Sequence, residues 1–189
     1  MLLLILGLVI FLGVHSVSIF ALSWRDAQAR RNEKAWKGIY SLLSLVGLVL
    51  IVYGFGMARQ SPVVLWVPPR GMNHLALLLM LPVFPLFIAP YFPGRIKTTL
   101  KHPQLVAVKL WAVAHLLANG NLHDVVLFGA FLAWAVVDRI SVKRRPLRPV
   151  PGAPASPAND VIVVVLGLAI YAAFVWRVHV WLIGVSPLG

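Results

Sequence analysis

The sequence predicts an all-α membrane protein, a polytopic helix bundle with about six transmembrane helices. Of its 189 residues, 60% are hydrophobic, and the mean hydropathy is +0.89. Soluble globular domains use roughly 45 to 50% apolar residues, so this composition indicates an integral membrane protein. Hydrocarbon cannot satisfy backbone polar groups, whereas a helix satisfies its own. We therefore expect helices and no strands.

Six apolar stretches come close to the roughly 20 residues that cross a bilayer as a helix. They cover residues 2–23, 38–58, 72–92, 103–119, 124–141 and 161–184. The fourth and fifth look short for a span. The third contains Pro82, Pro85 and Pro90, and each removes a backbone donor, so a kink is expected there. We expect the six helices to form a single transmembrane domain over residues 1–189.

The distribution of charge predicts the orientation of the chain. Lys and Arg number 17 against 5 Asp and Glu, a formal net charge of +12. The stretches after the first, third and fifth spans hold 13 of the cations, and the opposite loops hold only Arg59 and Arg70. By the positive-inside rule the 13 face the cytoplasm, and both termini lie outside. The basic excess thus reflects topology, supplemented by contact with anionic lipid, and no nucleic-acid partner is expected.

Several local features of the sequence add further expectations about processing, chemistry and loops. The first span lacks a basic leading region and a small-residue cleavage site, so we expect it to stay attached. The chain has no cysteine, which excludes disulfides, thiolate catalysis and Cys-ligated metals. Five prolines make the last cytoplasmic loop, about residues 143–159, a flexible linker. Asp160, or Asn159 before it, is expected to cap the sixth span.

Two histidines, His15 and His115, lie well inside predicted spans. Ionisable side chains are costly in hydrocarbon and mark functional sites there. Gln104, Val108, Trp111 and His115 share one helical face, which is too polar to meet lipid. At 1.5 Å per residue, the depths of the two histidines differ by about 6 Å, so the geometry allows an axial pair across a porphyrin. The alternative is that both are packing residues hydrogen-bonded to neighbouring helices.

Other charged or ionisable residues have weaker patterns. Lys109 either snorkels to the interface or neutralises an anionic group such as a haem propionate. Arg177 either clamps a propionate or carboxylate or snorkels outward. His102 lies about 140° from His115 around a straight helix, so the two cannot readily bind one ion. The histidines expected toward the outer surface are His74, His123 and His179, with His123 an exposed loop residue.

Common catalytic motifs are missing. There is no HExxH zinc motif, no Walker A loop and no Gly-rich dinucleotide fingerprint. Glu33 is the sole glutamate and lies in the basic segment after the first span, so catalysis by paired carboxylates is not expected.

Three ordered segments resemble a known family. They are GVHS at Gly13–Ser16, HPQLVAVKLWAVAHLLANGN at His102–Asn121, and FGAFLAWAVVDR at Phe128–Arg139. Together they resemble the NnrU family of bacterial membrane proteins over essentially the whole chain. The resemblance implies a multi-pass protein of the inner membrane, linked to nitrogen-oxide respiration (denitrification). It also implies a relation to 15-cis-zeta-carotene isomerases, which hold haem b between two histidines. His15 and His115 match those two positions.

The resemblance and the helical pattern together define the expected site. The expected cofactor is haem b, and its expected binding residues are His15, His115, Trp111, Gln104, Lys109 and Arg177. The expected partners are the lipid bilayer and either a hydrophobic small-molecule substrate or a respiratory membrane complex. Two alternatives are a non-enzymatic assembly or regulatory partner of a respiratory reductase and a methyltransferase of the isoprenylcysteine type. The second alternative rests on a fainter resemblance, an HP dipeptide followed by a hydrophobic helix.

Overall fold

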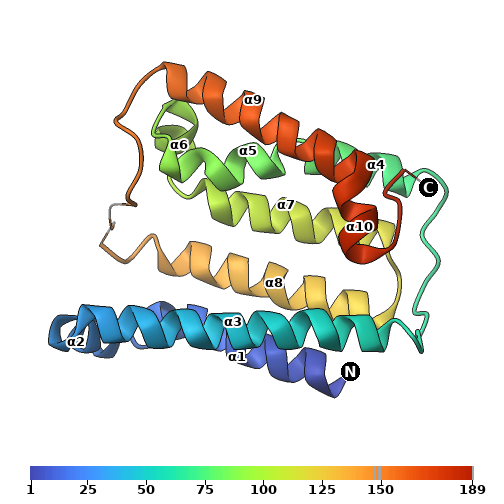
Figure 1. Ribbon diagram of the computed structural model, residues 1–189, viewed down its shortest axis with the longest axis horizontal. Helices are drawn as coiled ribbons and strands as arrows, with labels where there is room; N and C mark the ends of the chain where they lie inside the picture. Colours follow the sequence, from blue (N-terminus) through green and yellow to red (C-terminus); the bar gives the residue numbers. More distant parts are fainter. Residues whose placement is uncertain (147, 149, 189) are drawn as a thin grey trace. The chain divides into compact units, whose positions relative to one another are not determined.

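The computed structural model describes residues 1–146, 148 and 150–188 (Figure 1). The described part consists of helices and connecting segments, with one isolated β-bridge, between Val64 and Asn121. The all-α prediction is therefore confirmed. The helices of the protein are only weakly amphipathic, because they also expose many large apolar side chains on their outer faces. Such exposure is expected for a chain surrounded by lipid.

Four helical stretches of the described chain are long and apolar enough to cross a membrane. They are Leu2–Phe20, Glu33–Ala58, Met72–Tyr91 and Ala158–Ile183. The predicted fourth span is a shorter apolar helix, Pro103–Ala118, and the fifth lies in the charged 20-residue helix Leu122–Ser141, which is not among these four. The chain is thus a membrane protein, and the six-span count and the orientation of the termini stay predictions.

The chain divides into two compact units. The first comprises Met1–Trp66 and Asn121–Arg145, and the second comprises Val67–Gly120 and Pro146–Gly189. Each unit therefore contains two separate stretches of sequence, and the proposed ligands His15 and His115 belong to different units.

The first unit contains four helices. Its helices are α1 (Leu2–Phe20), α2 (Leu22–Arg31), α3 (Glu33–Ala58) and α8 (Leu122–Ser141). Helix α1 packs against both α3 and α8 (Figure 1). Glycines bring α1 and α3 together: a Cβ at Gly7 would lie 2.6 Å from the Ile51 nitrogen, and one at Gly47 would lie 2.7 Å from the Phe11 nitrogen. Small residues let membrane helices approach closely in this way.

The second unit contains two helices of 16 residues and several shorter elements. Its elements are α4 (Met72–Met80), α5 (Val83–Ile88), η1 (Ala89–Tyr91), α6 (Arg95–Leu100), α7 (Pro103–Ala118), α9 (Ala158–Ala173), η2 (Phe174–Val178) and α10 (His179–Ile183). Helix α7 packs against α4 and α5, and α9 packs against α5 (Figure 1). The predicted break in the third span lies at Pro82, between α4 and α5, where the missing N–H interrupts the helix.

Asp160 caps a different helix from the predicted one. Helix α9 begins two residues before it, and its carboxylate accepts hydrogen bonds from the backbone N–H of Arg95 (2.8 Å) and of Ile96 (3.0 Å), in the first turn of α6. The predicted alternative, Asn159, donates instead to the carbonyl oxygen of Pro93 (2.9 Å). The capping prediction for the sixth span was therefore wrong, and the two side chains join α9 to the segment that leads into α6.

The loop predicted as a flexible linker includes Leu147 and Pro149, which lie outside the described residues. The later part of this loop makes specific hydrogen bonds within the second unit. Ala153 N–H donates to Tyr91 O (2.8 Å), and Ser156 N–H donates to the carbonyl oxygen of Pro93 (3.2 Å).

Candidate functional site

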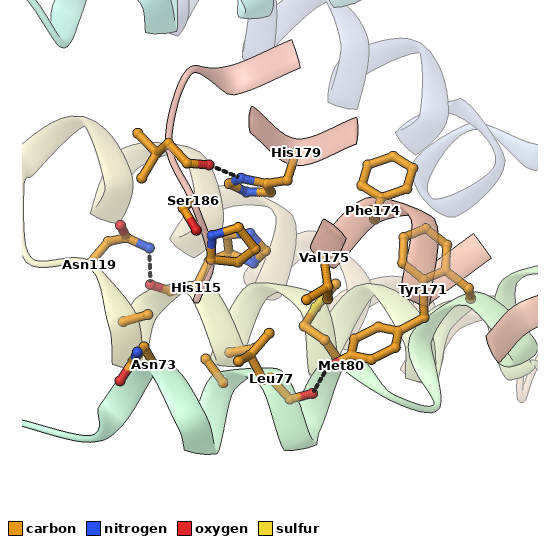
Figure 2. A pocket seen from close by; sticks show the side chains of 16 residues that line it. Asn73, Leu77, Met80, His115, Asn119, Tyr171, Phe174, Val175, His179 and Ser186 are labelled. Carbon is orange, nitrogen blue, oxygen red and sulfur yellow. Dashed lines mark hydrogen bonds between the residues drawn. The ribbon is translucent and has the colours of Figure 1, made fainter. Parts of the chain in front are cut away.

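A mostly apolar pocket of about 210 Å³ lies in the second unit beside His115. Helices α4, α5, α7, α9 and α10, the π-helical turn η2 and the C-terminal segment form its walls. Figure 2 shows a polar end with His115, Asn119, His179 and Ser186, and Tyr171 and Phe174 on the opposite side. Apolar walls with a few converging polar groups are typical of small-molecule and cofactor sites.

A backbone hydrogen bond orients the His115 ring. Its Nδ1 lies 2.8 Å from the carbonyl oxygen of Trp111, one helical turn earlier. A carbonyl oxygen can only accept, so Nδ1 carries the hydrogen, and in the neutral form of the ring the lone pair is on Nε2. Asn119 then donates its side-chain N–H to the His115 carbonyl at 2.9 Å, at the end of α7 (Figure 2). Metal-binding histidines are commonly held by a hydrogen bond of this kind at the second ring nitrogen.

His179 lines the same pocket, although the sequence placed it toward the outer surface without a role. Its Nδ1 lies 2.7 Å from the carbonyl oxygen of Val185 (Figure 2). The chain reverses at Gly184, whose φ of 78° is left-handed, and the residues that follow form one wall of the pocket. The preceding turn, η2, is a π-helix, which shifts the helical phase of His179. A straight-helix projection cannot show this shift.

The other predicted site residues of the second unit do not line this pocket. Gln104 donates to a backbone carbonyl of α5 at 3.2 Å. Trp111 packs against the buried core of the unit, with its ring centroid 5.3 Å from that of His115. Lys109 is half-buried on α7, and Arg177 is exposed on η2. Only His115 of these predicted residues is part of the pocket wall.

His15, in the first unit, has aromatic neighbours from three helices. Its Nδ1 lies 2.7 Å from the carbonyl oxygen of Phe11, and the Phe11 ring stacks on it with centroids 4.3 Å apart. The rings of Tyr40 on α3 and Trp134 on α8 lie 5.2 and 6.0 Å away. The indole N–H of Trp134 is buried and makes no hydrogen bond to any other described residue. The contact of Nδ1 with the Phe11 carbonyl gives His15 the same tautomer as His115, and the neighbours of its ring are aromatic.

The remaining histidines have different surroundings. His123, predicted as an exposed loop residue, is only 4% exposed. It lies in the first turn of α8 with its ring 5.1 Å from that of Phe55 and its Nε2 3.6 Å from an Asp124 oxygen, so that prediction was wrong. His74 is exposed on α4, and His102 precedes the first residue of α7. Within residues 1–146, 148 and 150–188, no three His, Asp or Glu side chains form a group that could hold a metal ion.

The sequence matches the family model described as NnrU protein over residues 3–187. The chain belongs to the NnrU family. The match includes both units of this NnrU protein and both proposed ligand histidines, and it confirms the resemblance carried by the three sequence segments. No curated protein and no solved structure matches the chain.

Proposed function

We propose that this NnrU-family protein is a multi-pass protein of the bacterial inner membrane that binds haem b, with His15 and His115 as the iron ligands. The observation that carries the proposal is that both rings make the same kind of hydrogen bond to the backbone. Each Nδ1 donates to the carbonyl oxygen one helical turn earlier, at 2.7 and 2.8 Å. In its neutral form each ring therefore has its lone pair on Nε2, which is the form that binds iron.

The surroundings of both histidines fit a flat, apolar cofactor. His15 lies among the rings of Phe11, Tyr40 and Trp134, and His115 borders a pocket with mainly apolar walls. Haem needs only axial ligands from the protein, so the lack of a three-residue metal cluster in the described chain does not count against it. The tautomers and the apolar setting together support haem over a free divalent ion.

Bound haem would supply a redox-active iron that can also act as a Lewis acid. The chain itself would fix both imidazole rings through the carbonyl groups of Phe11 and Trp111, and apolar side chains would exclude water. We propose that this site serves nitrogen-oxide respiration or a haem-dependent cis–trans isomerisation. In the second case, a hydrophobic substrate would lie against the apolar side of the pocket, near Tyr171 and Phe174.

Absorption spectra of the detergent-purified full chain, produced with ample haem, test the proposal. The oxidised and reduced protein should show a Soret band and a reducible b-type spectrum. His15→Ala and His115→Ala should each lower the haem content or change the spectrum. His74→Ala is the matched control, because His74 is an exposed histidine outside the pocket. A colourless wild-type protein would rule the proposal out.

The same preparations separate the alternatives. A non-enzymatic partner of a respiratory reductase would co-purify with that enzyme and keep its function in both histidine variants. A methyltransferase would bind S-adenosylmethionine saturably, and the two histidine variants would leave that binding unchanged.

A further inference from the structure

The first unit holds a second pocket, of about 270 Å³, whose lining is polar and basic. Its walls come from α1, α2 and α3, and its lining residues with polar side chains are Ser18, Arg25, Trp36, Lys37, Tyr40 and Ser41. None of them is a proposed haem ligand, and Tyr40 is the residue that this pocket shares with the surroundings of His15. The pocket therefore needs an explanation of its own.

The fold assembles this pocket from residues that are separated in sequence. Helix α2 follows α1 after a single residue, and Asn32 begins α3 by accepting a hydrogen bond from Ala35 N–H (3.0 Å). The rings of Trp24 and Trp36 meet edge to face, with centroids 5.7 Å apart, and this contact holds α2 against α3. As a result, Arg25 and Lys37 line one pocket although they are 12 positions apart in the sequence.

The lining offers hydrogen-bond donors to an anion. A guanidinium and an ammonium group are donors only, and the serine and tyrosine hydroxyls can also donate. Among the residues that the structure describes, none with a carboxylate belongs to the pocket wall. Asp26 pairs with Arg25 (3.0 Å) and Glu33 with Lys37 (2.7 Å), but neither carboxylate belongs to the wall, and both pairs are in contact with solvent. Such pairs contribute little energy, so a phosphate group can displace either carboxylate.

We infer that this pocket binds the phosphate group of an anionic phospholipid. Residues 24–37 carry five cations and two carboxylates, and the positive-inside rule assigns them to the cytoplasmic surface, where anionic lipids are concentrated. The neighbouring turns of α1 and α3 expose large apolar side chains: Phe20 is 79% exposed, Ile39 58% and Leu42 62%. These side chains offer a surface for acyl chains beside the phosphate, which a free phosphate ion would not need.

Lipid binding to the haem-free full chain tests this inference independently of the haem proposal. The measurement is native mass spectrometry in detergent with phosphatidylglycerol, with phosphatidylcholine as the zwitterionic reference. The test variant is R25Q/K37Q. The matched control is R30Q/K34Q, which removes the same charge from the same segment but from outside the pocket wall. Inorganic phosphate is added in a separate arm as a competitor.

The wild-type protein should retain phosphatidylglycerol in preference to phosphatidylcholine. R25Q/K37Q should bind phosphatidylglycerol at least about tenfold more weakly than R30Q/K34Q, because charge-assisted hydrogen bonds are lost only in the first variant. Ser41→Leu should weaken binding in the same way, because it fills the pocket without changing the charge. Ser41 is exposed, so this variant keeps the test valid if R25Q/K37Q does not fold.

Two results would overturn the inference. Equal weakening in the two double variants would mean general attraction between a basic segment and an anionic surface. Binding of inorganic phosphate that displaces phosphatidylglycerol and is itself as tight would identify a free anion, not a lipid, as the ligand.

Discussion

The carbonyl oxygen of Trp111 lies 2.8 Å from Nδ1 of His115, one turn further along α7. This contact fixes the plane of the ring and places the hydrogen on Nδ1. His15 makes the equivalent contact with Phe11 at 2.7 Å in the other unit. The haem proposal is based on these two histidines. Each is held by a backbone carbonyl one helical turn earlier, and both lie in segments that match one family.

Replacing His115 with glycine should leave a site that free imidazole can fill. The variant His115→Gly should lose the wild-type haem spectrum, and added imidazole should restore it, because the pocket beside His115 has room for a small ring. Titration with imidazole, followed by absorption, measures the effect. His74→Gly should show the wild-type spectrum without imidazole. If the folded His115→Gly protein already has the wild-type spectrum, His115 is not an iron ligand.

Two glycines of α3, Gly54 and Gly56, should respond differently to an added methyl group, because only Gly54 lies against α1. A Cβ at Gly54 would overlap the backbone of Leu4, whereas one at Gly56 would meet no described atom within 4 Å. Gly54→Ala should therefore destabilise the fold by roughly 1 to 3 kcal/mol. Gly56→Ala should be neutral or stabilise it by about 0.5 to 1 kcal/mol. Thermal unfolding in detergent compares the two, and equal stabilities would contradict the described packing of these helices.

The Asp160 carboxylate should stabilise the start of α6 from a distance of 64 residues in sequence. Asp160→Ala leaves the N–H groups of Arg95 and Ile96 without this acceptor, and it should cost about 1 kcal/mol of unfolding free energy. Asp160→Asn keeps one side-chain oxygen and should cost less. Denaturant unfolding in mixed micelles provides the values. If the two variants were equally stable, the carboxylate would not be acting as a cap.

The turn at Gly184 should control the wall formed by the C-terminal segment. Its φ of 78° disfavours a side chain, and a Cβ there would meet none of the described atoms within 4 Å, so the cost of Gly184→Ala is conformational. We expect about 1 to 2 kcal/mol of local destabilisation. Asparagine tolerates this conformation better, so Gly184→Asn should be milder. Hydrogen exchange of residues 180–188 measures the local effect. Exchange as slow as in the wild type in both variants would contradict it.

The sequence predicted features that depend on local pattern. Apolar runs located the four helical stretches that are long and apolar enough to cross a membrane, and Pro82 located the break between α4 and α5. The order of the GVHS, HPQ and FGAF segments identified the family. Each of these features depends on residues close together in sequence or on their order along the chain.

Features that depend on distant contacts were missed. Asp160 caps α6 because the fold brings its carboxylate to Arg95. His123 is buried because Phe55 of α3 lies against it. His179 reaches the pocket because a π-helical turn precedes it, and the sequence has no signal for such a turn. None of these relationships can be obtained from helical periodicity.

The spin state of the ferric haem in the purified protein tests the central claim most directly. Two imidazole ligands hold ferric iron low-spin, and loss of one leaves a five-coordinate or water-bound iron that is high-spin. Electron paramagnetic resonance should therefore show low-spin haem in the wild type and in His74→Ala, and loss of that signal in both His15→Ala and His115→Ala. Haem that stays low-spin in His15→Ala and in His115→Ala, or a wild-type protein that takes up no haem, would contradict the assignment.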